Sequence, residues 1–465
     1  MVKTWVLAIL AIIVLSTLSQ GARAAPGTAT PIQHVIIIMQ ENHSFDNYFG
    51  TYPTANGTLL DSTTAILHKV NGIPDQVCLP YLGSCVSPKL TTGQDPANPN
   101  EGQLVYQMDY SNNGTGFPTY SGPQSMVYFD YHSIPAYWDY AEEYGLADNY
   151  FAPILSQTTP NRLMILAGDT SVSSNYGPPP YIPYSQTLMQ QLDSAGVSWG
   201  YYDYTYSFDD ASSVYPLNYV SDRPPQAIND TREVSDLFQE LIRGSGLPSV
   251  TFVSSLGNAE LDEHPSSNPT TGELWTVDVI NTVMKSVYWP ETAIFLTWDE
   301  GGGYYDHVTP PKEFSIDHNF SAPLEGLGQR VPLLVISSYS RENIVSNTLM
   351  SHLSLLHFIE YNWKLSALNS LISESNLPLE FFNFSQSPRQ PTILNPFTTY
   401  PIPLESSSGG ISPVPPLEYG ILLVSTTVIL LALLARTIGS NPSLPRKRSS
   451  EPGFPSNTTA EAFMA

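Results

Sequence analysis

The sequence predicts an α/β fold, with a mostly parallel β-sheet flanked by helices. Two apolar runs, Val35–Met39 and Thr292–Trp298, are uninterrupted and rich in β-branched residues, which is typical of strands buried on both faces of a parallel sheet. Runs of this kind alternate along the chain with helical patterns, and this alternation indicates βαβ units. A length of 465 residues fits one large domain with insertions.

The remaining elements follow from the same patterns. Strands are expected at 197–205, 249–254 and 331–337, and helices at 132–144, 230–244, 273–287 and 349–365. Residues 51–125 are rich in Gly, Pro, Asn, Thr and Ser and lack periodicity, so they are expected to form a long insertion over one end of the sheet. Cys78 and Cys85 are the only cysteines, and a small-loop disulfide is expected between them.

The two ends of the chain predict an exported protein with a membrane anchor. Residues 1–24 have the basic start, apolar core and small-residue cleavage site of a signal peptide, with an uncleaved anchor as the alternative. The segments expected to follow are an extracellular domain at 25–397, a Pro/Ser/Thr-rich linker at 398–418, a transmembrane helix at 419–438 and a basic cytoplasmic tail at 439–465. The predicted location is the cell membrane, single-pass, with the folded domain outside. A C-terminal lipid-anchor signal is the rival.

Charge and glycosylation motifs narrow the classes of partner. A net charge of −24 excludes nucleic acid as a partner and leaves little for a basic membrane-binding face. Glycosylation motifs lie in the expected extracellular part, at Asn56, Asn113, Asn229, Asn319 and Asn383. Asn42 also stands in such a motif, but we expect it to be unmodified because a glycan would block the polar cluster described next.

Polar side chains follow the two buried strands at the points where the strands end. Glu41 and Asn42 follow the first strand, and Asp299 and Glu300 follow the second. Ligands bind outside the carboxyl ends of strands in open α/β sheets. Neighbouring carboxylates repel one another when buried unless a cation neutralises them, so these four residues predict an all-oxygen site for one divalent metal ion of unspecified identity. Three glycines, 301–303, allow the sharp turn that would return His307 to this site.

Four motifs resemble those of the phosphoesterase family of bacterial phospholipases C and acid phosphatases, which has an alkaline-phosphatase-like α/β fold. They occur in the family's order, within residues 31–365. The motifs are ENHSFDNYFG (41–50), TTPNR (158–162), EHP (263–265) and WDEGGGYYDH (298–307). The resemblance implies an enzyme that hydrolyses phosphoric esters, either phospholipid diesters or small phosphomonoesters.

The resemblance also implies roles for individual residues. Thr158 would be the nucleophile, held on the metal and forming a phosphothreonine intermediate. Read without the family, the Thr-Thr-Pro segment equally fits a turn that caps a helix. His264 and His307 would donate to the phosphoryl oxygens, and one of them would protonate the leaving group.

For three further residues, the predicted roles are less specific. Asn161 and Arg162 are expected to bind the substrate, although Arg162 is also suited to a structural ion pair. His352 stands where the family has an Asp-His pair, and without the aspartate it is expected to be a packing residue. The alternative for the whole chain is a non-catalytic cell-surface adhesion or binding protein on the same fold.

Overall fold

A computed structural model describes residues 27–55, 58–59, 70–93, 97–175, 181–204, 215–256, 258, 260–318, 320 and 323–395. All of them lie in the first of two compact units, Met1–Pro403. The predicted signal peptide (1–24), linker (398–418), transmembrane helix (419–438) and cytoplasmic tail (439–465) lie outside the described residues, as do Asn56 and Asn319.

The predicted location needs a correction. Within the part of the chain that the structure describes, no helix is long and apolar enough to cross a membrane. We therefore withdraw the prediction of a single-pass protein of the cell membrane, together with the predicted membrane contact through a C-terminal helix.

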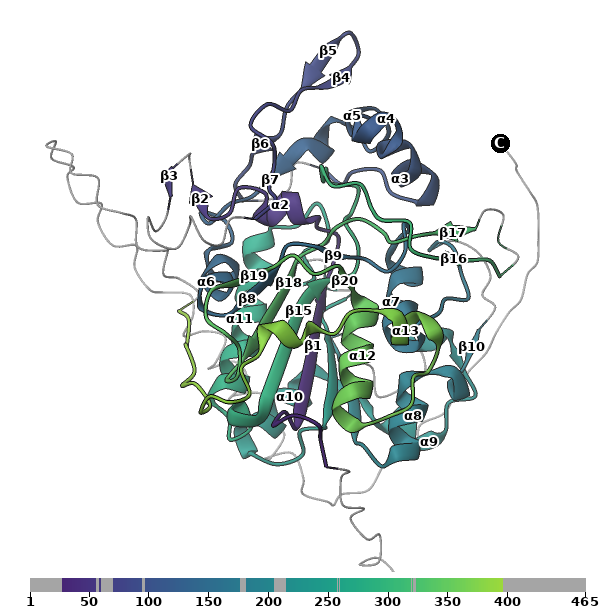
Figure 1. The fold of residues 1–465 in the computed structure, drawn as a ribbon, viewed down its shortest axis with the longest axis vertical. Coiled ribbons are helices and arrows are strands. Elements are labelled where there is room, and N and C mark those ends of the chain that lie inside the picture. The colour runs from purple at the N-terminus through teal and green to yellow at the C-terminus, as the bar shows by residue number, and fades with distance from the viewer. Residues whose placement is uncertain are drawn as a thin grey trace, which may run out of the picture. The chain divides into compact units, whose positions relative to one another are not determined.

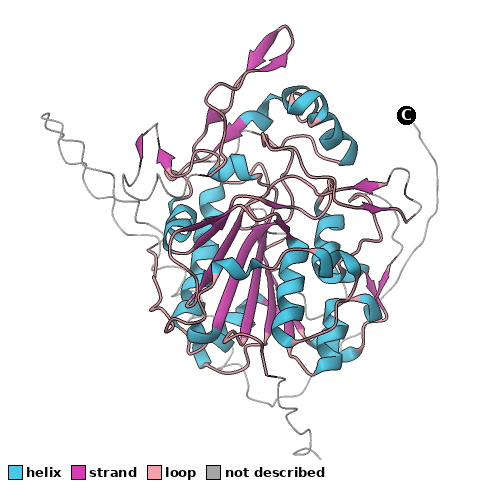
Figure 2. Cartoon of the chain, in the orientation of Figure 1, coloured by secondary structure: helices cyan, strands magenta, loops and turns pink. Residues whose placement is uncertain are grey.

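An eight-stranded sheet forms the centre of the fold (Figures 1 and 2). Its spatial order is β13 (Thr231–Glu233), β11 (Trp199–Asp203), β14 (Val250–Ser254), β1 (His34–Gln40), β15 (Thr292–Trp298), β18 (Leu333–Ser337), β8 (Gly145–Ala147) and β19 (Ile344–Ser346). All neighbouring pairs are parallel except the two that include β18. The predicted mostly parallel sheet is confirmed.

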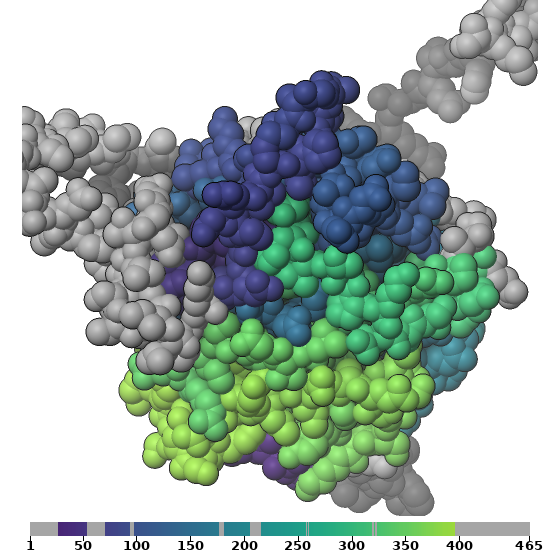
Figure 3. Space-filling view, turned by 45° about the horizontal axis from the view of Figure 1, so that its top comes forward, coloured from purple at the N-terminus to yellow at the C-terminus, as the bar shows by residue number. Residues whose placement is uncertain are grey.

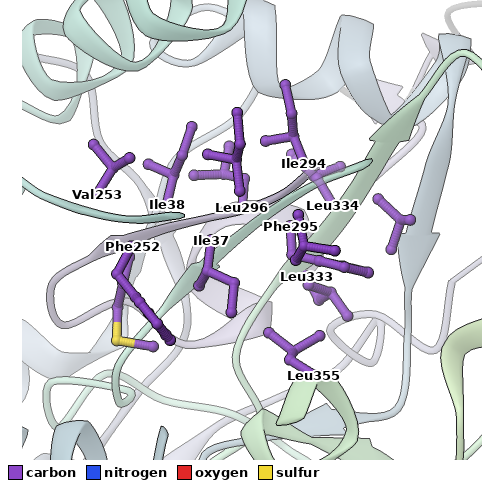
Figure 4. Packing of buried hydrophobic residues seen from close by; sticks show 14 of the residues in the cluster. Ile37, Ile38, Phe252, Val253, Ile294, Phe295, Leu296, Leu333, Leu334 and Leu355 are labelled. Carbon is purple, nitrogen blue, oxygen red and sulfur yellow. The ribbon is translucent and has the colours of Figure 1, made fainter. Parts of the chain in front are cut away.

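Helices cover both faces of the sheet (Figure 1). One group contains α7 (Thr158–Ala167), α8 (Leu188–Ala195) and α12 (His352–Trp363), and the other contains α6 (Pro135–Glu143), α10 (Val234–Arg243) and α11 (Pro269–Lys285). The core therefore lies on both sides of the central strands. Along β1, Ile37 and Ile38 point to opposite faces and both are buried, and Leu355 of α12 packs on the side of Ile37 (Figure 4).

The structure departs from the predicted elements mainly at short strands. Three of the first four residues expected in the 230–244 helix, Thr231–Glu233, pair with β11 as β13, and α10 begins only at Val234. The three-residue strands β8 and β19 were not predicted, because so few residues show no periodicity.

The insertion has more structure than its composition indicates. Its elements include the hairpin of β4 (Leu79–Tyr81) and β5 (Ser84–Val86), and the short helices α3 (Gln103–Asp109) and α5 (Phe117–Tyr120). The predicted Cys78–Cys85 disulfide is present and closes the hairpin. The insertion lies beyond the carboxyl ends of the central strands, next to α2 (Phe45–Phe49), which follows β1 (Figure 1).

Candidate active site

The register of β1 and β15 brings the two acidic strand ends together. Gln40 lies opposite Trp298, so Glu41 and Asp299 follow side by side. The backbone N–H of Asp299 donates to the Gln40 carbonyl oxygen at 3.1 Å, which extends the ladder by one step. Glu41 and Asp299 are 1% and 0% exposed. Two carboxylates are thus held next to each other at the buried edge of the sheet.

Thr158 reaches this pair from the start of helix α7. Its hydroxyl donates to Glu41 Oε2 at 3.3 Å. The first turn of a helix presents unpaired N–H groups and partial positive charge, which favours an anion close by. Thr158 and Glu41 line one open cleft of about 550 Å³ together with other polar and aromatic residues, which include Asp203, Tyr215, Tyr219, Asp262 and His264.

Arg162 and Asn161 both have contacts inside the protein. Arg162, one turn after Thr158, is buried and places Nη2 2.9 Å from Glu41 Oε1 and Nε 3.0 Å from Asp299 Oδ2. Asn161 accepts from the Ile154 N–H and donates to the Ser156 carbonyl oxygen. The ion pairs of Arg162 agree with the alternative given for it, a structural ion pair. Substrate binding by either residue stays a prediction.

Two oxygens in the cluster are buried without a hydrogen-bond partner, Asn42 Oδ1 and Glu300 Oε1. Asn42 is 0% exposed, which leaves no room for a glycan on its side chain. Glu300 is also buried, and its other oxygen accepts from the Tyr106 hydroxyl at 2.8 Å and from the Gly302 N–H at 2.7 Å. Buried polar atoms are normally paired, so these two oxygens call for a ligand.

The raised pKa values of the buried carboxylates also favour a bound cation. Burial raises the pKa of Glu41 well above its ordinary range, and the Asp299 charge raises it further, although Arg162 opposes both. Burial likewise raises the pKa of Glu300, with the charges of Glu101 and Asp299 adding to it. A divalent cation relieves this repulsion and takes carboxylate and amide oxygens as ligands. The residues present therefore fit the predicted metal ion, with Glu41, Asn42, Thr158, Asp299 and Glu300 as its surroundings.

His264 and His307 lie in different clusters. His264 lines the cleft with Thr158, and its Nδ1 is 2.5 Å from the Pro265 carbonyl oxygen. His307 instead places Nδ1 2.7 Å from Asp46 Oδ2 and Nε2 3.1 Å from Asn71 Oδ1. Burial alone would lower the pKa of His307, but the Asp46 carboxylate outweighs this effect and raises it. These contacts hold His307 in another network, and its phosphoryl contact stays a prediction.

That network is a second place where a cation could be expected. Ligand atoms of Asp46, Asp306 and His307 lie within 4.8 Å of one another. However, the buried Arg330 guanidinium already pairs with Asp46 at 2.9 Å and with Asp306 at 3.1 Å. We interpret this cluster as an ion-pair network that joins the start of α2 to the segment after β15.

Sequence reasoning missed several residues around the site. Glu101 accepts from Asn42 Nδ2 at 3.0 Å, and both Glu101 and Tyr106 come from the insertion, whose sequence has no local pattern that marks them. His352, expected to pack, is buried in α12 and has Nε2 3.1 Å from the Asp299 carbonyl oxygen. A motif reports residues that are near in sequence, and these contacts join residues far apart.

The fold and the cluster together define an α/β protein in which a hydroxyl at a helix start faces buried carboxylates at adjoining strand ends. The chain belongs to the Phosphoesterase family, whose model matches residues 32–366, and it is a hydrolase of phosphoric ester bonds.

Curated relatives of the chain are named as phospholipases C. Phospholipase C B of Mycobacterium tuberculosis is 28% identical over 399 residues, with 73% of this chain and 74% of the relative covered. Hemolytic phospholipase C of Pseudomonas aeruginosa is 27% identical, with 72% of this chain and 53% of the relative covered. Among solved structures, a phosphonate monoester hydrolase of Agrobacterium radiobacter matches with a TM-score of 0.37 at 13% identity, covering 75% of this chain and 77% of that one. So low a TM-score leaves the alkaline-phosphatase-like fold a prediction.

Proposed function

We propose that this hydrolase is a metal-dependent enzyme of the phospholipase C type with Thr158 as its nucleophile. The observation that carries the proposal is the Thr158 hydroxyl, which opens into the cleft while hydrogen-bonded to a buried carboxylate. A divalent cation held by Glu41, Asn42, Asp299 and Glu300 would supply positive charge beside the hydroxyl and the phosphoryl oxygens.

The protein's own residues supply the remaining steps. Glu41 Oε2 accepts the hydrogen bond of the Thr158 hydroxyl and is placed to take its proton as Oγ1 attacks phosphorus. The bond from phosphorus to the lipid alkoxide then breaks, and His264, on the wall of the same cleft, gives that alkoxide a proton. Water then attacks phosphorus and gives a proton back to His264, while the bond from phosphorus to Oγ1 breaks and Oγ1 takes back the proton held by Glu41. This step releases the phosphorylated headgroup and restores the Thr158 hydroxyl.

The lining of the cleft favours a diester with a cationic headgroup over a phosphomonoester. Asp203 and Asp262 add negative charge to that of Glu41, and Tyr215 and Tyr219 add aromatic faces. A phosphomonoester dianion is repelled more strongly by such a wall than a diester monoanion is, and a quaternary ammonium group is attracted by both carboxylates and tyrosine rings. The names of the relatives support the same choice. The alternative, a non-catalytic adhesion protein, does not explain why the Thr158 hydroxyl faces a buried carboxylate.

Replacing Thr158 by Ala tests the proposal. We expect turnover of p-nitrophenylphosphorylcholine to fall by at least about 10³-fold, because loss of a nucleophile removes the covalent route. Chelation should abolish turnover in the wild type, and p-nitrophenyl phosphate should be the poorer substrate. Thr282→Ala, the same change in helix α11 and away from the cleft, should keep turnover. Full activity of Thr158→Ala would remove this residue from its role, and turnover that survives chelation would remove the metal.

A further inference from the structure

The insertion places two side chains directly on residues of the candidate metal site. Glu101 stands just before helix α3, and its Oε1 accepts from Asn42 Nδ2 at 3.0 Å. Tyr106 lies within the same helix, is buried, and donates its hydroxyl to Glu300 Oε2 at 2.8 Å. The two contacts come from one short stretch of chain and fall on two residues that each have a buried side-chain oxygen without a hydrogen-bond partner.

Each contact determines which oxygen is left for a ligand. A carboxylate accepts hydrogen bonds, so the Glu101 contact fixes the Asn42 amide with its NH₂ toward Glu101 and its Oδ1 turned elsewhere. Tyr106 and the Gly302 N–H together occupy Glu300 Oε2, which leaves Oε1 unpartnered. Without these donors and this acceptor, the amide and the carboxylate would be free to rotate about their terminal bonds.

The insertion packs closely enough against the turn after β15 to hold Asn42 and Glu300 in these orientations. The glycine turn after β15 lies directly beneath it, because a Cβ on Gly303 would be 2.6 Å from the Asn100 carbonyl oxygen. At the first residue of α3, Gln103 Nε2 donates to the Pro323 carbonyl oxygen at 3.1 Å. Figure 3 shows the blue insertion packed against the green segment that follows β15. Residues 97–126 are thus part of the wall of the site and do more than cover the sheet.

We infer that Glu101 and Tyr106 are positioning residues of the metal centre, which orient Asn42 and Glu300 so that one oxygen of each faces the cation. The inference rests on the proposed metal-dependent function. Partners in the second layer of a metal site hold the ligands in their binding orientation, and their loss typically weakens metal affinity by roughly 10- to 100-fold. This chain takes that layer from the insertion, which explains why the sheet motifs alone do not contain it.

Calorimetric titration of the chelated full-length protein with Mn²⁺ tests the inference. Tyr106→Phe and Glu101→Met, which removes the acceptor oxygen, should each weaken Mn²⁺ affinity by roughly 10-fold or more. Tyr120→Phe, at the end of α5, removes the same hydroxyl elsewhere in the insertion, and Glu313→Met removes an exposed carboxylate; both should bind like the wild type. Thermal unfolding without metal reports on folding, and Glu101→Met, which keeps a side chain of similar length, serves if Tyr106→Phe is unstable.

The outcomes separate this inference from the function on which it rests. If the wild type binds Mn²⁺ and both variants bind it equally well, the positioning role is overturned and the metal site stands. If the wild type binds no Mn²⁺, the proposed metal-dependent function is overturned as well. A further readout is turnover at saturating Mn²⁺, where both variants should recover most of the wild-type kcat, because the ligands themselves are intact. A kcat that stays low with Mn²⁺ bound would contradict a positioning role.

Discussion

Arg162 is the residue on which the buried carboxylates of the site depend most directly. Its guanidinium lies between Glu41 and Asp299, and all three side chains are buried. Removing one partner of a buried ion pair leaves an uncompensated charge, which costs about 3–5 kcal/mol. We therefore expect Arg162→Met to lower the free energy of unfolding by about that amount in chelator, measured by urea denaturation.

A metal ion should offset part of this loss. Saturating Mn²⁺ places positive charge beside the same carboxylates, so the gap between Arg162→Met and the wild type should narrow when it is added. Arg243→Met, on the exposed side of α10, is the matched control and should change little. If Arg162→Met is as stable as the wild type in chelator, Arg162 is not needed to neutralise the Glu41 and Asp299 carboxylates.

Glu263 should make the folding stability of the protein depend on pH. Burial raises the pKa of this carboxyl from 4.5 to about 7, although hydrogen bonds from Tyr137, Trp298, Tyr48 and Gln40 oppose the rise. Between pH 4.5 and 7 the unfolded chain has therefore lost a proton that the folded chain keeps, so folding stability falls as the pH rises through this window.

The variant Glu263→Gln cannot titrate and should lack this fall. Urea denaturation across the window should show the wild type losing stability relative to the variant up to about pH 7, with a constant difference above it. Curves that stay parallel throughout would contradict the assignment. The readout is a slope, so it survives any overall loss caused by the substitution.

Among the elements, the glycine turn after β15 packs closely against the site. Gly302 has a φ of +62°, and a Cβ there would lie 2.3 Å from the Asn42 carbonyl oxygen. Gly83, in the β4–β5 hairpin, has a φ of +80° but nothing within 4 Å of its Cβ position. Both Gly→Ala changes cost about 1 kcal/mol for the left-handed backbone, but only Gly302→Ala adds a clash with the site.

We expect Gly302→Ala to lose most turnover and Mn²⁺ affinity, because the displaced turn carries the N–H that holds Glu300. Gly83→Ala should keep both. Activity assays and titration of the pair measure the difference directly. Equal behaviour of the two variants would mean that close approach of the turn to Asn42 is not needed.

The whole molecule shows what the sequence could and could not predict. The buried strands and their acidic ends were predictable, because uninterrupted β-branched runs occur in a parallel sheet and the polar residues that end them stand out. The parallel pairing then brings Glu41 beside Asp299. A structural ion pair was among the expectations for Arg162, but its partners were not predictable, nor was the role of Glu101, because each contact joins residues more than 50 positions apart.

The two histidines show the same limit. Both follow plausible motifs, yet His264 enters the cleft and His307 turns to Asp46. The direction of a loop after a strand is set by tertiary partners such as Arg330, which pairs with Asp46, Asp148 and Asp306 at once. Only the three-dimensional structure separates these two clusters.

Anomalous diffraction from crystals soaked in Mn²⁺ locates the cation among the candidate ligands. We expect one strong peak within bonding distance of Glu41, Asn42, Thr158, Asp299 and Glu300. A peak confined to the cluster of Asp46, Asp306 and His307, with none beside Thr158, would contradict the proposed metal site.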